Sequence, residues 1–77
     1  MTYDAELDAL GLLCPLPVLK ARKRLQGLAP GGILKILTDD PAAVIDIPHF
    51  CAESGHELLQ VQETETGHIH YIARKGG

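Results

Sequence analysis

Two prolines beside a cysteine, in Cys14-Pro15-Leu16-Pro17, restrict the backbone of this chain more than any other segment. Proline is tolerated in the first turn of a helix, where its missing N–H would have no intrahelical partner, but it breaks a helix interior. The motif therefore predicts that a helix begins at Cys14-Pro15. A thiolate there would be stabilised by free N–H groups and by the helix dipole, which lower the pKa of a cysteine from about 8.5. We therefore expect Cys14 to be an activated nucleophile.

The predicted helix has one apolar face and a distinct end. Apolar side chains recur three and four residues apart, the spacing of a buried helical stripe: Val18, Ala21, Leu25 and Leu28. Residues 29–32, Ala-Pro-Gly-Gly, end the helix. Strands are predicted on both sides of it. Residues 4–9 alternate polar and apolar side chains, and residues 33–37 form a nearly continuous apolar run that is typical of a central strand.

A second helix is predicted after the central strand. Asp39-Asp40-Pro41 supplies a cap and a proline for its start, and Gly55 supplies its end. Pro48 lies inside the same stretch, so the helix is either kinked there or capped again by Asp46.

Two final strands are predicted at residues 57–63 and 68–74, around a turn at residues 65–67. His68 and His70 share one face of the last strand. Because polar side chains alternate along both strands, we expect this face of the sheet to be largely open to water and the two histidines to be solvated.

The order strand, helix, strand, helix, strand, strand predicts a fold of the α/β (α+β) class. Right-handed crossovers place both helices on the same face of a four-stranded mixed sheet, which gives a two-layer β-α-β-α-β-β sandwich. A chain of 77 residues suits one domain, residues 1–77, with a modest core and no deep, enclosed substrate pocket.

Composition excludes several functional classes. Ten acidic residues outnumber seven Lys and Arg, which argues against direct nucleic-acid binding. No apolar run reaches membrane-spanning length, so no membrane association is expected. The acidic N-terminal segment lacks the pattern of a secretion signal, and two cysteines in such a chain are typical of free thiols. These features predict a cytoplasmic protein.

The surroundings of Cys14 suggest a docking surface for another protein. Leu16 and Leu19 fall outside the buried stripe, within about a turn of the cysteine, and four of the seven basic residues lie within residues 20–24. Apolar side chains ringed by positive charge suit a protein partner better than a small molecule. The alternative is that both leucines are ordinary boundary residues.

Cys51 lies in an apolar stretch of the second helix and is expected to be a buried structural thiol. A Cys14–Cys51 bridge, as in a redox carrier, stays an open alternative, although the chain has no Cys-x-x-Cys pair. The histidines and cysteines do not match a standard zinc spacing, so no metal site is predicted.

Segments along nearly the whole chain resemble, in order, the TusA/SirA family of sulfur-carrier proteins. They are Gly11-Leu12-Leu13-Cys14-Pro15-Leu16-Pro17, Leu28-Ala29-Pro30-Gly31, Thr38-Asp39-Asp40-Pro41-Ala42, Asp46-Ile47-Pro48-His49-Phe50-Cys51, Gly55-His56-Glu57-Leu58 and Ile72-Ala73-Arg74-Lys75. The likeness is to TusA proper more than to other branches, and the family fold is the same two-layer sandwich.

The resemblance implies a sulfur relay without a bound cofactor. A cysteine desulfurase or rhodanese would pass sulfane sulfur to Cys14, and the persulfide would go to an acceptor protein for thiolation of the tRNA wobble uridine. Sulfur oxidation and molybdenum-cofactor synthesis are alternatives, as is a non-catalytic regulatory or protein-binding module. Pro15 and Pro17 would support the persulfide. Partner contacts are expected from one helix and the neighbouring loop: Leu16, Leu19, Lys20, Arg22, Lys23 and Asp40.

Overall fold

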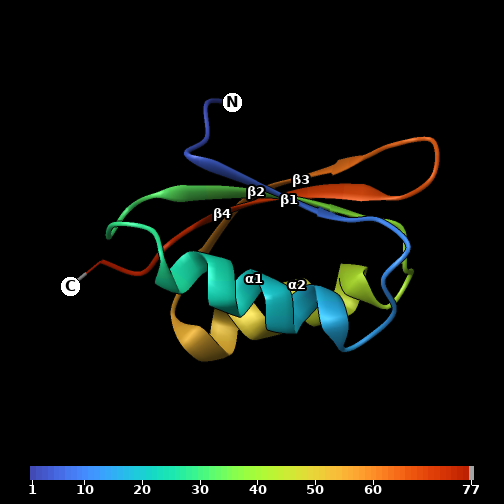
Figure 1. Cartoon of the computed structure of the whole chain (residues 1–77), viewed down its shortest axis with the longest axis horizontal. Coiled ribbons are helices and arrows are strands. Elements are labelled where there is room, and N and C mark those ends of the chain that lie inside the picture. The colour runs from blue at the N-terminus through green and yellow to red at the C-terminus, as the bar shows by residue number, and fades with distance from the viewer. Residues whose placement is uncertain (77) are drawn as a thin grey trace.

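Six regular elements follow one another along residues 1–76, the part of the chain that the computed structural model describes (Figure 1). Their order and bounds are β1 (Ala5–Ala9), α1 (Leu16–Gln26), β2 (Ile33–Thr38), α2 (Ala43–Ser54), β3 (Glu57–Glu63) and β4 (His68–Ala73). Every predicted element is present, and the strands agree with the predicted ranges to within one residue at each end.

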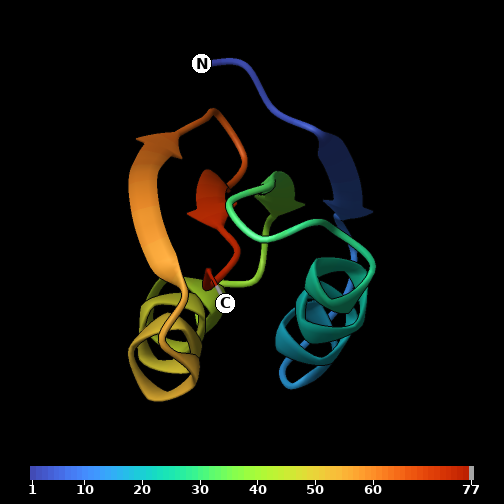
Figure 2. The ribbon, with the colours of Figure 1, turned by 90° about the vertical axis from the view of Figure 1, so that its left-hand side faces the viewer.

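The four strands form one mixed sheet in the order β1-β2-β4-β3. β1 and β2 are parallel, whereas β4 is antiparallel to both β2 and β3. Figure 2 shows both helices on the same side of this sheet. The predicted two-layer β-α-β-α-β-β sandwich is therefore confirmed.

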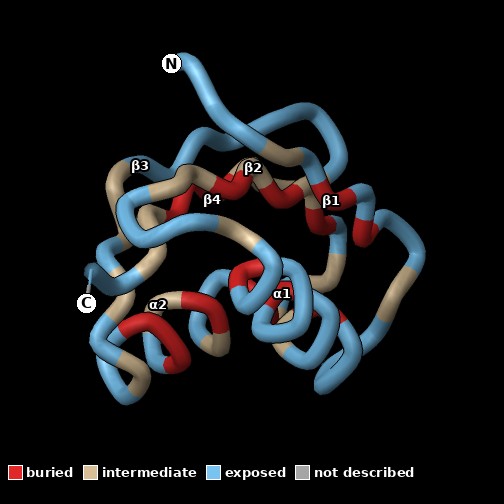
Figure 3. The backbone as a smooth tube through the Cα atoms, turned by 60° about the vertical axis from the view of Figure 1, so that its left-hand side comes forward, coloured by how far each residue is buried: buried red, intermediate tan, exposed pale blue. Residues whose placement is uncertain are grey.

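The core lies between the helices and the sheet, where the buried segments of both layers face each other (Figure 3). Leu34 and Ile36 of β2 are fully buried there. On α1 the buried positions are Pro17, Ala21 and Leu25, one residue in every four. Pro17 thus has a packing role in addition to restricting the helix start, which the spacing of the apolar residues alone did not indicate.

α2 continues through Pro48 without interruption and ends at Gly55, whose φ of 79° is left-handed. Asp46 lies in the first turn and does not cap a second helix, so that alternative is wrong. Proline removes one backbone hydrogen bond, but buried Ile47 and Phe50 hold the surrounding turns against the core. Among residues 1–76, no helix has both the length and the apolar character needed to cross a membrane.

The histidines of β4 occupy the opposite environment to the predicted one. His70 is completely buried and His68 is half-buried. The strand register places His70 directly opposite Ile36 of the core, so its ring lies on the helix side of the sheet. The open side instead carries Tyr71, whose ring lies 6.4 Å from that of Tyr3. The prediction of two solvated histidines is therefore wrong, because the register turns this face of β4 toward the helices.

Candidate functional site

Cys14 lies in the loop between β1 and α1, where its thiol is exposed and free. α1 begins at Leu16 and Pro15 is the N-cap residue, so the cysteine precedes the cap by one position. The Cys14–Pro15 peptide bond is cis. The backbone N–H of Leu16 donates to the carbonyl of Leu13 at 2.9 Å. The helix therefore begins directly after the predicted Cys14-Pro15 start, with the cysteine just outside the cap.

The pKa of the Cys14 thiol is raised above its ordinary value. The main cause is the Asp46 carboxylate, and desolvation and the negative charge of Asp40 add to its effect. The expected lowering of this pKa by the end of α1 is therefore wrong, since the carboxylates of Asp46 and Asp40 raise it. The neighbouring carboxylates therefore disfavour the thiolate, which is the nucleophilic form of the cysteine.

Replacing Asp46 by asparagine is expected to lower the Cys14 pKa, because the substitution removes a negative charge that disfavours the thiolate. The rate of alkylation by iodoacetamide, measured against pH in a Cys51→Ser background, reports this pKa. The profile should move to lower pH, with faster alkylation at pH 7. Glu53→Gln, on the same helix, is the matched control and should leave the profile in place. A Cys14 pKa that stays unchanged or rises in Asp46→Asn would contradict the assignment.

The backbone of the Cys14 loop is bound by two neighbouring carboxylates. The N–H of Gly11 donates to both oxygens of Asp39, at 2.9 and 3.0 Å. The N–H of Cys14 donates to Oδ2 of Asp40 at 2.7 Å. The sequence indicated Asp40 as a partner contact and as part of the cap of the second helix, whereas in the structure its carboxylate also binds the Cys14 loop.

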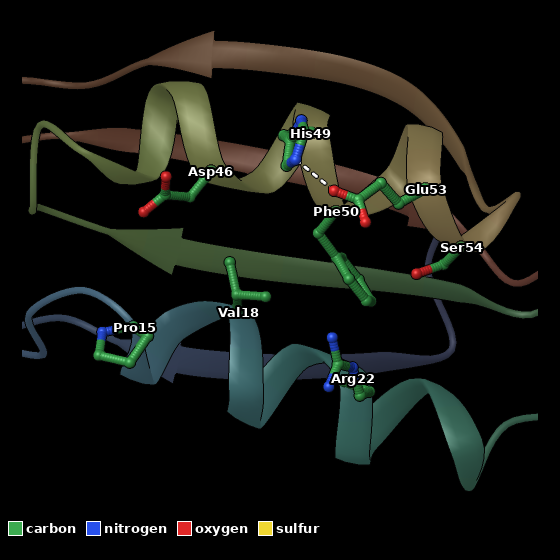
Figure 4. Close-up of a pocket in the computed structure, with 8 residues that line it drawn as sticks. All are labelled: Pro15, Val18, Arg22, Asp46, His49, Phe50, Glu53 and Ser54. Carbon is green, nitrogen blue, oxygen red and sulfur yellow. Dashed lines mark ion pairs between the residues drawn. The ribbon is translucent and has the colours of Figure 1, made fainter.

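A groove of about 330 Å³ runs between α1 and α2 from the position of Pro15 (Figure 4). Arg22 extends from α1 and its guanidinium lies 5.5 Å from the centroid of the Phe50 ring. His49 and Glu53 form an ion pair along the opposite wall. The remaining lining residues are Val18, Asp46 and Ser54. No enclosed pocket was predicted, and this open groove beside the thiol was not anticipated, because its walls come from two helices distant in sequence.

The predicted leucines do lie on the surface. Leu16 and Leu19 are 43% and 47% exposed. Leu13, which was not among the predicted contacts, is 69% exposed and directly precedes the cysteine. An apolar surface therefore flanks the thiol, as a docking site for a protein would require.

The predicted basic residues separate into two groups. Arg22 lines the groove between the helices, whereas Lys20 and Lys23 border a different depression between α1 and β1, together with Arg24. The structure therefore does not bring the predicted basic contacts together at one place. A single partner surface centred on the thiol would include Arg22 more readily than the two lysines.

Cys51 is buried in the core with 2% of its surface exposed, as predicted. Burial raises the pKa of its thiol to about 11. Both cysteines are free. Within residues 1–76, no three His, Cys, Asp or Glu side chains are grouped closely enough to hold a metal ion. The site combines one exposed thiol with neighbouring carboxylates.

The fold and this site define a small α/β protein that presents a single thiol on its surface. The family model described as sulfurtransferase TusA matches residues 5–75. The sulfur carrier protein TusA of Pseudomonas syringae pv. syringae is 44% identical over 75 residues, which cover 97% of this chain and 89% of that protein. The chain therefore belongs to the TusA family of sulfur carrier proteins.

Other relatives agree with this placement. The sulfur carrier protein TusA of Pseudomonas aeruginosa is 46% identical over 74 residues, covering 96% of this chain and 94% of that protein. Among solved structures, the SirA-like protein of Desulfitobacterium hafniense superposes with a TM-score of 0.79 at 28% identity. The alignment covers 96% of this chain and the whole of that one. The resemblance seen in the sequence is confirmed, together with a general role in sulfur transfer.

Proposed function

We propose that Cys14 carries sulfane sulfur as a persulfide between a donor protein and an acceptor protein. The observation that carries the proposal is the exposure of the Cys14 thiol in a chain of the sulfur carrier family, while the only other thiol, Cys51, is buried. A carrier must bring its sulfur atom into contact with two different proteins in turn. An exposed thiol on a surface loop, flanked by apolar side chains, meets this requirement.

Loading is a sulfur-transfer step that resembles thiol–disulfide exchange. The Cys14 thiol loses its proton to solvent, and the resulting thiolate attacks the outer sulfur of a persulfide on the donor. A new S–S bond forms on Cys14, the S–S bond of the donor breaks, and the donor cysteine leaves as a thiolate. Discharge repeats the step in reverse, when a thiolate of the acceptor attacks the terminal sulfur and releases Cys14. No net oxidation or reduction occurs in either step.

The burial of the second thiol supports this carrier role. A cysteine within reach of the persulfide would attack Cys14, form an internal disulfide and release the sulfur as sulfide. Cys51 is packed in the core and its thiol is held protonated at neutral pH. The persulfide on Cys14 is therefore attacked by a thiolate of another protein and not by Cys51.

For the donor we propose a cysteine desulfurase or a rhodanese, and for the destination thiolation of the tRNA wobble uridine, in the cytoplasm. The likeness to TusA proper, at 44% to 46% identity over nearly the full chain, supports this choice. Sulfur oxidation or molybdenum-cofactor synthesis would use the same loading step with a different acceptor. Loading is therefore the step to test first.

The test is to incubate the protein with a cysteine desulfurase and cysteine and then to determine its intact mass. We expect the addition of one sulfur atom that a reducing agent removes, and peptide mapping should place it on Cys14. Failure to form such an adduct with either a desulfurase or a rhodanese donor would overturn the proposal.

A further inference from the structure

The loop that carries Cys14 follows β1, and it is bound at two points by carboxylates of the segment that follows β2. β1 and β2 run in the same direction, with Ala9 opposite Thr38, so the segments that follow them leave the sheet at the same edge. Figure 1 shows both connections at the right-hand end of the sheet. Asp39 and Asp40 directly follow β2 and therefore lie beside the loop that follows β1.

The segment that carries these two carboxylates is held in place by β2 and by the start of α2. β2 is an interior strand, paired with β1 on one side and β4 on the other. Asp40 is also tied to the start of α2, since its Oδ1 accepts a hydrogen bond from the N–H of Ala42 at 3.2 Å and its carbonyl accepts one from Ala43 at 3.0 Å. One side chain thus joins the cysteine loop to the second helix.

The hydrogen bonds to Asp39 and Asp40 attach the loop to a segment that is distant in the sequence. A carboxylate accepts shorter and stronger hydrogen bonds than a neutral oxygen does, and the Cys14 bond measures 2.7 Å. By comparison, the bond from Leu12 to the carbonyl of Ala9 is 3.3 Å long. Gly11, the second anchor, has a φ of 78°, which other residues adopt only with strain. The backbone at this point follows the path that brings its N–H to Asp39.

We propose that Asp39 and Asp40 are positioning residues for sulfur transfer, which hold the Cys14 loop so that its sulfur meets the donor persulfide in line. This inference rests on the proposed function of Cys14. Neither carboxylate is required to touch the donor or the acceptor. The arrangement has an electrostatic cost, because the charge of Asp40 also raises the pKa of Cys14. Asp40 therefore favours sulfur transfer by positioning the loop and disfavours it by raising the Cys14 pKa. Substitutions can separate these two effects.

Two substitutions of Asp40 separate these effects. Asp40→Asn retains an oxygen that can accept the Cys14 N–H but removes the charge, whereas Asp40→Ala removes both. Both variants should shift the alkylation profile of Cys14 to lower pH. When each rate is divided by the ionised fraction of Cys14 taken from the alkylation profile, we expect Asp40→Ala to load sulfur from the desulfurase about tenfold more slowly than the wild type. The loss should appear in kcat rather than in KM. Asp40→Asn should restore most of the rate.

Glu65→Ala is the matched control. Glu65 borders the same surface depression as Asp40, but its carboxylate accepts no hydrogen bond from the described residues. The control should leave both the pH profile and the loading rate unchanged. Equal rates for Asp40→Ala and the wild type would overturn the proposal, as would equal slowing by the alanine and asparagine variants. If Asp40→Ala does not fold, Asp39→Ala tests the same restraint through Gly11.

Amide hydrogen exchange keeps this proposal distinct from the proposed function. Asp40→Ala should accelerate exchange of the Cys14 amide about tenfold or more, and Asp39→Ala should do the same for Gly11. If the wild type accepts no sulfur from any donor, the proposed function fails, while exchange still reports on the loop. Unchanged exchange of the Cys14 amide in Asp40→Ala would overturn the positioning role by itself.

Discussion

Cys14→Ser is expected to abolish sulfur loading completely. A serine hydroxyl cannot form the S–S bond on which the carrier step depends, and it is a far weaker nucleophile than a thiolate. The variant should fold normally, because the side chain it replaces is exposed on a loop. Intact mass after incubation with a cysteine desulfurase and cysteine should show no added sulfur, while the wild type gains one atom under the same conditions.

Cys51→Ser is the matched control, since it removes the other thiol of the chain. Cys51 is 2% exposed and its pKa is raised to about 11, so it takes no part in transfer at neutral pH. The variant should load one sulfur atom as the wild type does, at some cost in stability from a hydroxyl placed in the core. Sulfur retained on Cys14→Ser would contradict the mechanism. A cellular role that survives Cys14→Ser would instead indicate a protein-binding module.

The fold could be predicted from the sequence because its signals are local. Two prolines at the start of α1, Ala-Pro-Gly-Gly after it and Gly55 after α2 each act on the backbone within a few residues. The strands alternate polar and apolar side chains or form an apolar run, and the order of elements then leaves few topologies. The same local reasoning misjudged Pro48, because the packing of α2 on the sheet outweighs one lost hydrogen bond.

The candidate site was predictable only in part, since its chemistry depends on contacts between distant segments. The Cys-Pro-Leu-Pro motif indicated Cys14 as the exposed thiol. The Asp46 carboxylate that raises its pKa and the carboxylates of Asp39 and Asp40 come from at least 25 residues away in the sequence. A prediction of the Cys14 pKa shift from the helix dipole alone therefore had the wrong direction. The parallel pairing of β1 and β2 is the feature that could have placed Asp39-Asp40 beside the loop.

His70 shows most directly why a strand face is hard to assign from a short pattern. Alternation defines two faces but does not say which one the helices cover, and a slip of one residue exchanges them. In the structure His70 is fully buried, and neither ring nitrogen has a hydrogen-bond partner among residues 1–76. Burial, with a smaller contribution from His68, lowers the pKa of His70 from 6.5 to about 4. The core therefore accepts this ring only in its neutral form.

Stability is expected to fall in mild acid through His70. Because its folded pKa lies below the unfolded value, the contribution of the neutral ring is complete above about pH 6.5 and is lost as the pH falls toward about 4. Over this interval the unfolded chain binds a proton that the folded chain does not. The shift corresponds to about 3 kcal/mol in total, of which about 2 kcal/mol should be lost by pH 5.

His70→Leu should remove this acid-dependent loss, because leucine fills the buried position without a group that titrates. Urea unfolding at pH 7, 6 and 5 measures the free energy of unfolding of the variant and the wild type. We expect the difference between them to grow in favour of the variant by about 2 kcal/mol between pH 7 and pH 5. His49→Gln, at an exposed position on α2, is the control and should follow the wild type within about 0.5 kcal/mol. The prediction is contradicted if the free energy of unfolding changes equally with pH in His70→Leu and the wild type. His70 would then be protonated in the folded protein as readily as in the unfolded chain.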